Sequence, residues 1–319
     1  MLMTRFTELV GCDIPLQQAG MGGVAGPDLA VAVSKAGALG TVAMHMMPAP
    51  VVAEALDGMR QRTTAPVGFN VLMPFLDRDG VEAAASRCRF VEFFYGEPDA
   101  VLVGLVHQGG ALAAWQIGSR SEAVAARDAG CDVVIAQGVE AGGHIRGTVG
   151  LLALLPDVVD AVDVPVVAAG GIGTARAMAA ALAAGADAVR VGTRFVATPE
   201  ADAHPDYVDA LVRARAEDTT LTEAFSVMWP DAPHRVLRSC VERAEAEDEE
   251  VVGEREANGT VIPVPRLSVM CPTRATKGAI DAMALYAGES VTAVRAVMPA
   301  ADVVRELASG AEALLAQQG

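Results

Sequence analysis

One histidine of this chain follows an apolar run and a pair of glycines. Residues 131–136 are apolar apart from Asp132, which predicts a short buried strand, and Gly142, Gly143 and His144 come shortly after it. Flexible backbone and an ionisable side chain at the end of a buried strand are typical of the catalytic face of an α/β barrel. A histidine with a pKa near ~6.5 takes up and releases protons at neutral pH. We therefore predict that His144 is the acid/base residue of an enzyme.

Other side chains are alternative candidates for chemistry. A structural role is the commoner fate of a single histidine, and the flanking glycines are what favours function for His144. His45, near the end of another predicted strand, is the second candidate for the base. Asn70, at the end of a third strand, could hydrogen-bond a heterocyclic ring or form a turn. Tyr95 and Met21 are candidate walls of an apolar pocket, although core packing explains them equally well.

Three glycine-bearing loops follow predicted strands, at residues 19–23, 169–174 and 191–194. The last two follow the seventh and eighth strands, where many barrels bind a phosphate through backbone N–H groups and a helix N-terminus. Glycine lets the backbone approach the phosphate oxygens, and the hydroxyl of Thr193 adds a donor. Any one of these loops could be a plain turn, but the pair predicts a phosphate site. The spacing differs from the Rossmann fingerprint.

Short β-like runs and helical segments alternate over the first 200 residues, which predicts an α/β fold, a (β/α)8 TIM barrel. The strands are predicted at Pro15–Ala19, Leu39–Ala43, Val67–Leu72, Phe90–Tyr95, Ala111–Ile117, Asp132–Gln137, Pro165–Ala169 and Ala188–Val191. Helices are predicted at Pro27–Lys35, Pro50–Gln61, Ser121–Ala129 and Ala175–Ala184. Thr174 and either Ser119 or Ser121 are the expected N-caps, and Gly37, Gly130 and Gly185 the expected helix stops.

The alternation is lost after Pro199, so we assign residues 1–200 and 270–319 to the barrel and residues 200–270 to a helical, acidic insertion. Residues 204–216 look helical, and Thr219–Val227 is expected to extend that helical region. Residues 241–256 carry eight acidic side chains, which indicates a solvated helix face or a mobile loop, or else a lid over the barrel mouth. The last helix, Ala300–Ala316, should pack against the barrel wall.

Composition narrows the class of protein. The 319 residues are 52% hydrophobic and 20% charged, which is globular, and the net charge of −16 disfavours nucleic acid and anionic membranes as partners. The five cysteines form no C-x-x-C pair, so we expect no metal site and no disulfide framework, and a reducing cytoplasm fits best. We see no secretion signal and no membrane span. A homodimer is the assembly we consider.

Taken together, these residues resemble the nitronate monooxygenase family, FMN-dependent barrels formerly called 2-nitropropane dioxygenases. The resemblance runs through Pro-Leu-Gln-Gln-Ala-Gly-Met at 15–21, Gly-Phe-Asn at 68–70 and Ala-Gln-Gly at 136–138. It continues through Gly-Gly-His at 142–144, Ala-Ala-Gly-Gly-Ile at 168–172 and Val-Gly-Thr-Arg-Phe at 191–195. It ends with Tyr-Ala-Gly-Glu-Ser at 286–290, so that it spans almost the whole chain.

The resemblance implies roles for individual positions. The histidine of the Gly-Gly-His string is the family's catalytic base, here His144. The resemblance assigns flavin contacts to Asn70 and Gln137 and places Met21 and Gly22 beside the isoalloxazine. It assigns the remaining cofactor contacts, those to the phosphate among them, to Gly142, Gly143, Gly170, Gly171, Gly192 and Thr193. Two departures stand out: Arg190 replaces a frequent glutamine and could add charge near the phosphate, and Glu289 replaces another.

The implied reaction is oxidation of alkyl nitronates by O2 through a flavin semiquinone, giving a carbonyl product and nitrite. For a neutral nitroalkane, His144 would first remove the α-proton. The rival reading is an FMN-dependent reductase that consumes NAD(P)H, similar to enoyl-acyl-carrier-protein reductases or quinone reductases. A flavin-binding barrel without turnover is the reading from a different class.

Overall fold

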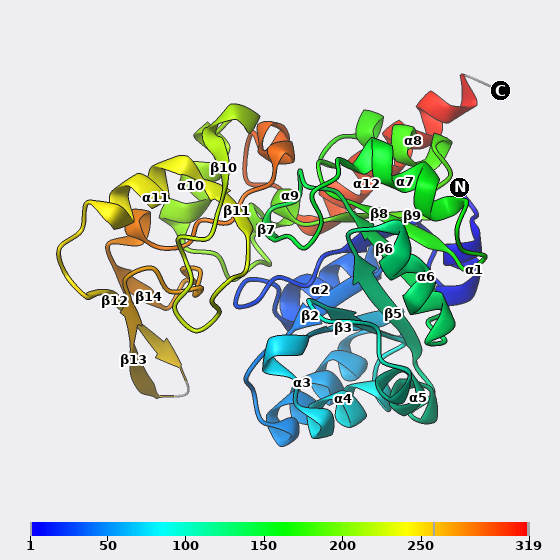
Figure 1. The fold of residues 1–319 in the computed structure, drawn as a ribbon, viewed down its shortest axis with the longest axis horizontal. Coiled ribbons are helices and arrows are strands. Elements are labelled where there is room, and N and C mark those ends of the chain that lie inside the picture. Colours follow the sequence, from blue (N-terminus) through cyan, green and yellow to red (C-terminus); the bar gives the residue numbers. More distant parts are fainter. Residues whose placement is uncertain (1, 258, 318–319) are drawn as a thin grey trace.

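The computed structural model describes residues 2–257 and 259–317, and an eight-stranded parallel sheet forms its core (Figure 1). Each predicted strand is present with ends within one residue of the prediction. The strands are β1 (Leu16–Gln18), β2 (Gly40–Ala43), β3 (Val67–Leu72), β4 (Phe90–Phe94), β5 (Leu112–Ile117), β6 (Val133–Gln137), β8 (Val166–Ala169) and β9 (Ala188–Val191).

The sheet curls until its two ends meet. Its order is β1-β9-β8-β6-β5-β4-β3-β2, and residues just before β2 reach back to β1 at the other end. The N–H of Gln18 donates to the carbonyl of Leu39 at 2.9 Å, and the N–H of Leu39 donates to the carbonyl of Leu16 at 2.9 Å. The predicted (β/α)8 barrel is therefore confirmed, and the carboxyl ends of all eight strands face the same side.

Helices surround this barrel. They are α1 (Arg5–Val10), α2 (Pro27–Lys35), α3 (Ala49–Arg62), α4 (Arg78–Ala85), α5 (Ala100–Gln108), α6 (Arg120–Asp128), α7 (Leu151–Val159) and α8 (Ala175–Ala183), with a short α9 (Thr193–Val196) after the last strand. The side chains of Ser119 and Thr174 accept the expected N-cap hydrogen bonds, from Glu122 and Ala177. The three glycine stops adopt positive φ, as predicted.

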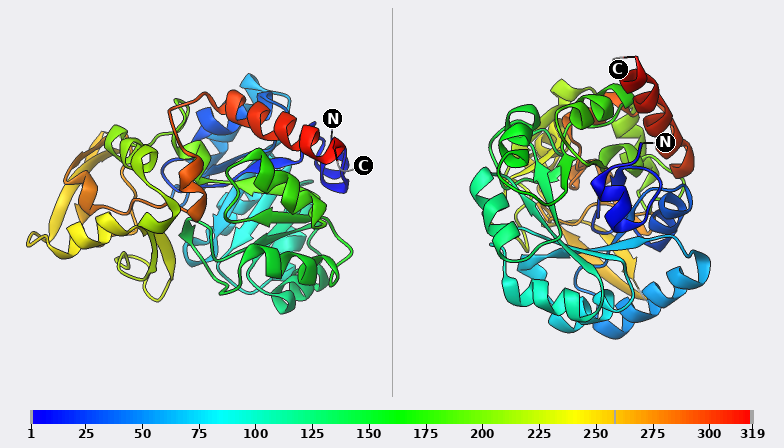
Figure 2. Two further views of the ribbon diagram at one scale, coloured as in Figure 1. Left: turned by 90° about the horizontal axis from the view of Figure 1, so that it is seen from above. Right: turned by 90° about the vertical axis from the view of Figure 1, so that its right-hand side faces the viewer.

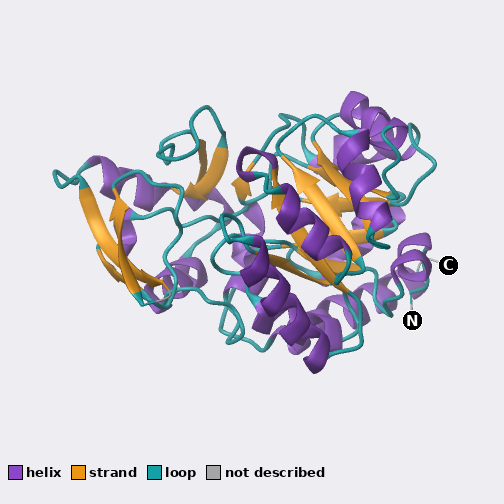
Figure 3. Cartoon of the chain, turned by 90° about the horizontal axis from the view of Figure 1, so that it is seen from below, coloured by secondary structure: helices purple, strands orange, loops and turns teal. Residues whose placement is uncertain are grey.

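The chain then builds a second group of elements, on the left of Figure 1. It comprises α10 (Pro205–Arg213), β10 (Thr219–Thr222), β11 (His234–Leu237), α11 (Arg238–Glu245), β12 (Val251–Ala257), β13 (Thr260–Pro265) and β14 (Thr276–Gly278), with 3-10 turns at 216–218, 280–282 and 289–293. A further 3-10 turn, at 73–75, follows β3 in the barrel. We call residues 200–298 the lobe. In Figure 3 its small antiparallel sheets stand apart from the barrel strands.

The helix expected over Thr219–Val227 is wrong. Residues 219–222 form strand β10, which pairs antiparallel with β11. Three of its four residues are β-branched threonines, whose restricted χ1 favours an extended backbone. The acidic segment 241–256 is not a single loop either: it contains the end of α11, a turn and most of β12, the central strand between β13 and β14.

Two connections tie the lobe to the barrel. The loop after β6 supplies β7 (Gly143–His144), which pairs with β11 in the register His144 with His234, so that a barrel loop becomes an edge of a lobe sheet. After the lobe, α12 (Ala300–Ala316) returns and packs against α8 and α2 (Figure 2). Val303, Val304 and Leu307 are buried there, so the predicted packing of this helix is confirmed.

Two further features concern the whole chain. All five cysteines are buried free thiols. No helix in the described part of the chain is long and apolar enough to cross a membrane. The division of the chain into barrel and insertion stays a prediction; β14, which lies after residue 270, is hydrogen-bonded to β12 of the lobe.

Candidate active site

A cavity of about 500 Å³ lies where the carboxyl ends of the barrel strands meet the lobe. That volume lies within the range of small-molecule and cofactor sites. The predicted site residues come from the ends of five different barrel strands, and the barrel brings all of them to this one wall. They are Met21, Gly22, Asn70, Gln137, Gly142, Gly143, His144, Gly170, Gly171, Gly192 and Thr193. Their individual roles stay predictions.

His144 lies in an aromatic surround. Its ring stacks on Trp229, with ring centroids 3.8 Å apart and an interplanar angle of 15°. Tyr95 and Tyr286 approach it at 6.0 Å and 5.7 Å between centroids. Its Nε2 is buried and has no hydrogen-bond partner among the described residues. A nitrogen that the protein itself leaves unused is available to a ligand in the cavity.

The surroundings also set the charge of this histidine. Burial, followed by the neighbouring His234 and His45, lowers the pKa of His144 from its ordinary 6.5 to about 3. Burial likewise lowers the pKa of His45, which lines the same cavity, to about 4. Both rings are therefore neutral at neutral pH. A neutral imidazole can accept a hydrogen bond at one ring nitrogen, so both rings line the cavity as uncharged groups.

Two amides lie beside His144 at the strand ends. Gln137 donates through Nε2 to the carbonyl oxygen of His144 at 3.1 Å, while its Oε1 is buried without a donor. Asn70 donates through Nδ2 to Glu92 at 2.7 Å. Gly20 has to be glycine, because a Cβ there would lie 2.4 Å from the Cβ of Asn70. The unpaired Oε1 of Gln137 is thus available to accept a hydrogen bond from a ligand in the cavity.

A buried carboxylate organises the floor of the cavity, which we define as Gln17, Asn70, Glu92 and Arg190. Glu92 is fully buried and accepts from Gln17 Nε2 at 2.6 Å and from Arg190 Nη1 at 2.5 Å, besides the bond from Asn70. Asn70 and Arg190 line the cavity above it. The charge that Arg190 adds is thus compensated inside the barrel, which sequence alone did not indicate.

The glycine loops after β8 and β9 also line the cavity. Gly170 and Gly171 have φ of 108° and 68°, which side chains rarely adopt, and a Cβ on Gly170 would lie 2.9 Å from the carbonyl oxygen of Gly138. The hydroxyl of Thr193 accepts from the N–H of Gly288 at 3.0 Å, which ties this loop to the motif at 286–290. Exposed backbone of this kind suits a phosphate.

The lobe contributes residues that sequence reasoning missed. Trp229 and Arg255 line the cavity, but they lie in the irregular region after Pro199, where no periodicity indicated a position. Their residue types were the only signal: one of two tryptophans, and an arginine inside an acidic run. Tyr95 does not form the wall itself; it packs behind it, 4.7 Å from Trp229 between ring centroids. The lid stays a hypothesis.

The sequence of this chain is similar to those of known proteins. Residues 3–85 and 75–310 match the family described as nitronate monooxygenase. A Rhodococcus jostii protein named (3aS,4S,5R,7aS)-5-hydroxy-7a-methyl-1-oxo-octahydro-1H-indene-4-carboxyl-CoA dehydrogenase is 39% identical over 240 residues, which are 75% of this chain and, at 66%, just under two thirds of that protein.

Solved structures agree in fold over the whole length. FabK from Thermotoga maritima superimposes with a TM-score of 0.85 at 29% identity, covering 100% of this chain and 99% of that one. A nitroalkane oxidase from Streptomyces ansochromogenes superimposes with a TM-score of 0.76 at 31% identity, covering 98% of this chain and 100% of that one. Because these alignments run from end to end, the lobe is shared as well as the barrel.

Proposed function

Because the chain belongs to the nitronate monooxygenase family, we propose that it is an FMN-dependent enzyme that oxidises alkyl nitronates with O2 to a carbonyl product and nitrite. The family makes the chain an oxidoreductase and supports a flavin as its cofactor. FMN in particular, the nitronate and the role of each site residue are the proposed parts. The observation that carries the proposal is the neutral His144, whose Nε2 is buried without a partner in the wall of the cavity.

The cavity wall suits FMN. Gln137 Oε1 lacks a donor, and a ring N–H of a flavin is a donor of the required kind. Asn70 would hold the ring from the floor, with Met21 and Gly22 beside it. The bare backbone at Gly170, Gly171 and Gly192, with Thr193, would hold the phosphate. Gly142 and Gly143, which line the same cavity, would also contact the cofactor. When bound, FMN supplies the redox chemistry, accepting electrons from the substrate and passing them to O2.

His144 would handle the proton. A nitroalkane carries an acidic hydrogen on the carbon next to its nitro group, and the neutral Nε2 would accept that hydrogen as a proton. A positioned base contributes typically ~10²–10⁴-fold in rate. Trp229, stacked on the ring, fixes its orientation and keeps water from one of its faces. A nitronate has already lost this proton, so it needs His144 for binding only.

The first experiment is a spectrum of the FMN-loaded protein without oxygen, before and after an alkyl nitronate is added. We expect the visible flavin absorbance to fall and to return when oxygen is admitted, with nitrite and a carbonyl compound released. An absorbance that ignores the nitronate would overturn nitronate oxidation and leave the flavin assignment standing. Failure to bind FMN at all would overturn the proposal that FMN is the cofactor.

A matched pair of variants tests the base. His144→Asn should slow turnover of a neutral nitroalkane about 10²–10⁴-fold and slow turnover of the corresponding nitronate much less, because only the former needs proton removal. His107→Asn, at an exposed histidine bonded to Asp132, is the control and should change neither rate. Equal losses on both substrates would remove His144 from the proton step.

A second candidate is redox chemistry on an acyl thioester, which the similarity to the Rhodococcus dehydrogenase favours. A thioester also has an acidic α-hydrogen, so the same nitrogen of His144 would take it up. This candidate includes the NAD(P)H-consuming reductase reading, since such reactions run in either direction. Steady NAD(P)H oxidation with an enoyl thioester, together with a flavin spectrum that ignores nitronate, would select it.

A further inference from the structure

Two arginines line the cavity, and they differ in one respect. Arg190 is paired with Glu92 in the floor. The side chain of Arg255 has no hydrogen bond and no ion pair among the described residues, and its Nε is buried without a partner. Within the described part of the cavity wall, Arg255 is thus the cation whose charge no carboxylate compensates at close range.

The lobe holds Arg255 in place. It lies on β12, the central strand of a small sheet, opposite Ile262 of β13 and Thr276 of β14. Its Nη1 would lie 3.8 Å from a Cβ built on Gly23, so the guanidinium reaches the loop that follows β1. A neighbouring lobe segment contacts the same loop, since the thiol of Cys271 donates to the carbonyl oxygen of Gly22 at 3.1 Å. The guanidinium is therefore carried on regular structure, which limits its movement.

No carboxylate among the described residues forms an ion pair with the Arg255 guanidinium. Asp202 and Glu256 line the same cavity, and neither comes within ion-pair distance of Arg255. Burial raises the pKa of Asp202, while Arg274 and Arg255 oppose that rise, which places this carboxyl in the field of both arginines. A half-buried guanidinium without a partner loses hydration and gains little in return.

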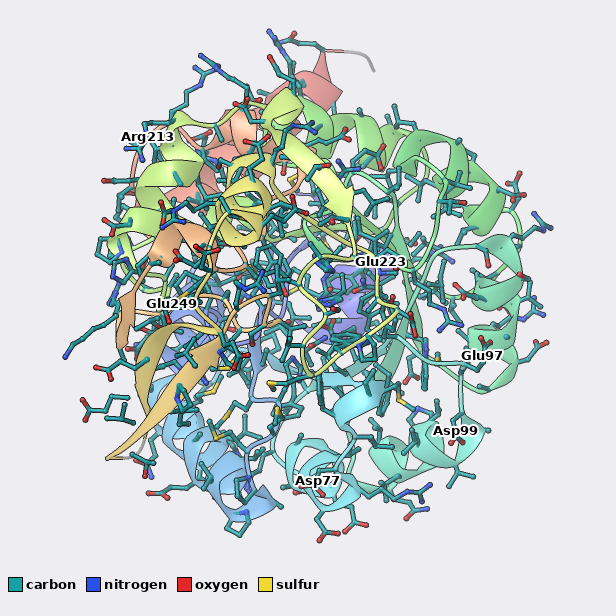
Figure 4. The ribbon with its side chains drawn as sticks, turned by 60° about the vertical axis from the view of Figure 1, so that its left-hand side comes forward. Asp77, Glu97, Asp99, Arg213, Glu223 and Glu249 are labelled. Carbon is teal, nitrogen blue, oxygen red and sulfur yellow. The ribbon has the colours of Figure 1, made fainter. Side chains whose placement is uncertain are left out.

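Outside the cavity the surface is acidic. The chain has a net charge of −16, and Figure 4 shows Asp77, Glu97 and Asp99 along the edge of the barrel, in the loops that follow β3 and β4. Such a surface does not attract anions in general. A single uncompensated cation inside it acts locally, on an anionic group that the rest of a ligand has carried into the cavity.

We propose that Arg255 binds an anionic group of the substrate, a carboxylate or a phosphate, that is separate from the reacting carbon. The planar fork of a guanidinium matches either oxyanion through two parallel N–H···O bonds. The proposal deepens the proposed function, because it concerns the substrate of that same site. It implies a substrate that spans the cavity from His144 to the loop at Gly22–Gly23.

Equilibrium binding to the FMN-loaded protein tests this without any turnover. Two probe pairs are titrated by calorimetry: pentanoate with pentanamide, which differ in the carboxylate, and 4′-phosphopantetheine with pantetheine, which differ in one phosphate. The unchanged protein should prefer the charged member of one pair. Arg255→Gln should remove about ten- to a hundredfold of that preference, since a charge-assisted hydrogen bond is lost. The pair that responds identifies carboxylate or phosphate.

Two further variants make the result specific. Arg255→Lys keeps the charge and loses the fork, so it should retain part of the preference. Lys277→Gln removes the same charge from the same small sheet, at an exposed position outside this cavity, and should leave the preference intact. The FMN content of each variant reports whether it has folded.

Three outcomes decide the matter. A preference that survives Arg255→Gln, or falls equally with Lys277→Gln, would overturn the anion site, as would the absence of any preference. A preference that depends on Arg255, in a protein whose flavin ignores nitronate, would keep the anion site and overturn the proposed oxidation. The two failures are therefore distinguishable.

Discussion

The floor and the lobe-side wall of the cavity differ in how their charged groups are compensated. In the floor, Glu92 accepts hydrogen bonds from Gln17, Asn70 and Arg190, and its charge is compensated. In the wall, His144 and Arg255 each have a buried nitrogen with no partner. Gln17 Oε1 in the floor is also buried without a partner among the described residues, so the contrast is one of charge: Glu92 is paired with Arg190, whereas Arg255 has no carboxylate within ion-pair distance among those residues.

The difference separates structure from ligand binding. Barrel strands meet at fixed spacing, so a carboxylate placed on β4 reaches donors on β1, β3 and β9 at once. A carboxylate that three donors hold in this way keeps the floor rigid. The wall carries groups that cost free energy in the absence of a ligand, which is how binding sites differ from packed cores.

The largest expected effect comes from a substitution that disrupts the ion pair in the floor. Glu92→Gln keeps the shape of the side chain but leaves the Arg190 charge buried without its partner, so the free energy of unfolding should fall by about 3–5 kcal/mol. Denaturant unfolding of the FMN-free protein measures the loss. The double variant with Arg190→Gln should recover part of it, because no uncompensated charge then remains.

A surface ion pair provides the comparison for that result. Arg120 and Asp157 are paired at 2.8 Å, with about half of each side chain exposed. Arg120→Gln should therefore cost roughly 0–1 kcal/mol. If Glu92→Gln cost no more than this, the floor network would not be the rigid element that we describe.

The next effect lies in the wall and depends on pH. The folded pKa values of His144 and His45 are lowered to about 3 and about 4, so below the ordinary 6.5 the unfolded chain binds more protons than the folded one. Stability is therefore complete above about pH 6.5 and is lost as the pH falls toward 4, by on the order of 2 kcal/mol for each ring after solvent screening.

Unfolding of the FMN-free protein across this pH range measures the loss. The variants His144→Asn and His45→Asn should each flatten the acid side of the curve, whereas His107→Asn should not. A curve of unchanged slope in the first two variants would show that these rings titrate normally and would contradict the burial argument.

The smallest expected effect comes from a substitution of Trp229, which packs against His144 in the wall. Trp229→Phe keeps an aromatic ring of smaller size against His144 and should cost less than about 1.5 kcal/mol in stability. It should also raise the pKa of His144, because burial is the main cause of its depression and a smaller ring admits more water. Titration of the histidine resonances by NMR measures that shift. A pKa that does not move would assign the depression to the barrel side alone.

Much of the barrel was predictable from the sequence. Most of the strands are short, largely apolar runs, which is typical of parallel strands that are buried on both faces. The glycine loops and His144 were predictable for a related reason, since they directly follow such runs and all barrel strand ends meet on one face. Gly170 and Gly171 also need positive φ, which leaves a visible mark in the sequence.

The lobe was not predictable in the same way. Thr219–Thr222 looked helical in its neighbourhood but becomes a strand because β11 lies beside it. The pairing of β7 with β11, which sets His144 against the lobe, joins residues about 90 apart, and nothing local encodes it. Pairings between distant segments of irregular spacing leave no period in either segment.

The sequence by itself determined the barrel, the face that carries the chemistry and the residues that come to that face, because these follow from local periodicity and from glycine. Only the tertiary structure decided their states. It paired Arg190 with Glu92, left Arg255 without a partner, and placed Trp229 against a neutral His144. Charge compensation and desolvation depend on which distant side chains lie within a few ångströms, and the packing of elements far apart in the sequence sets that proximity.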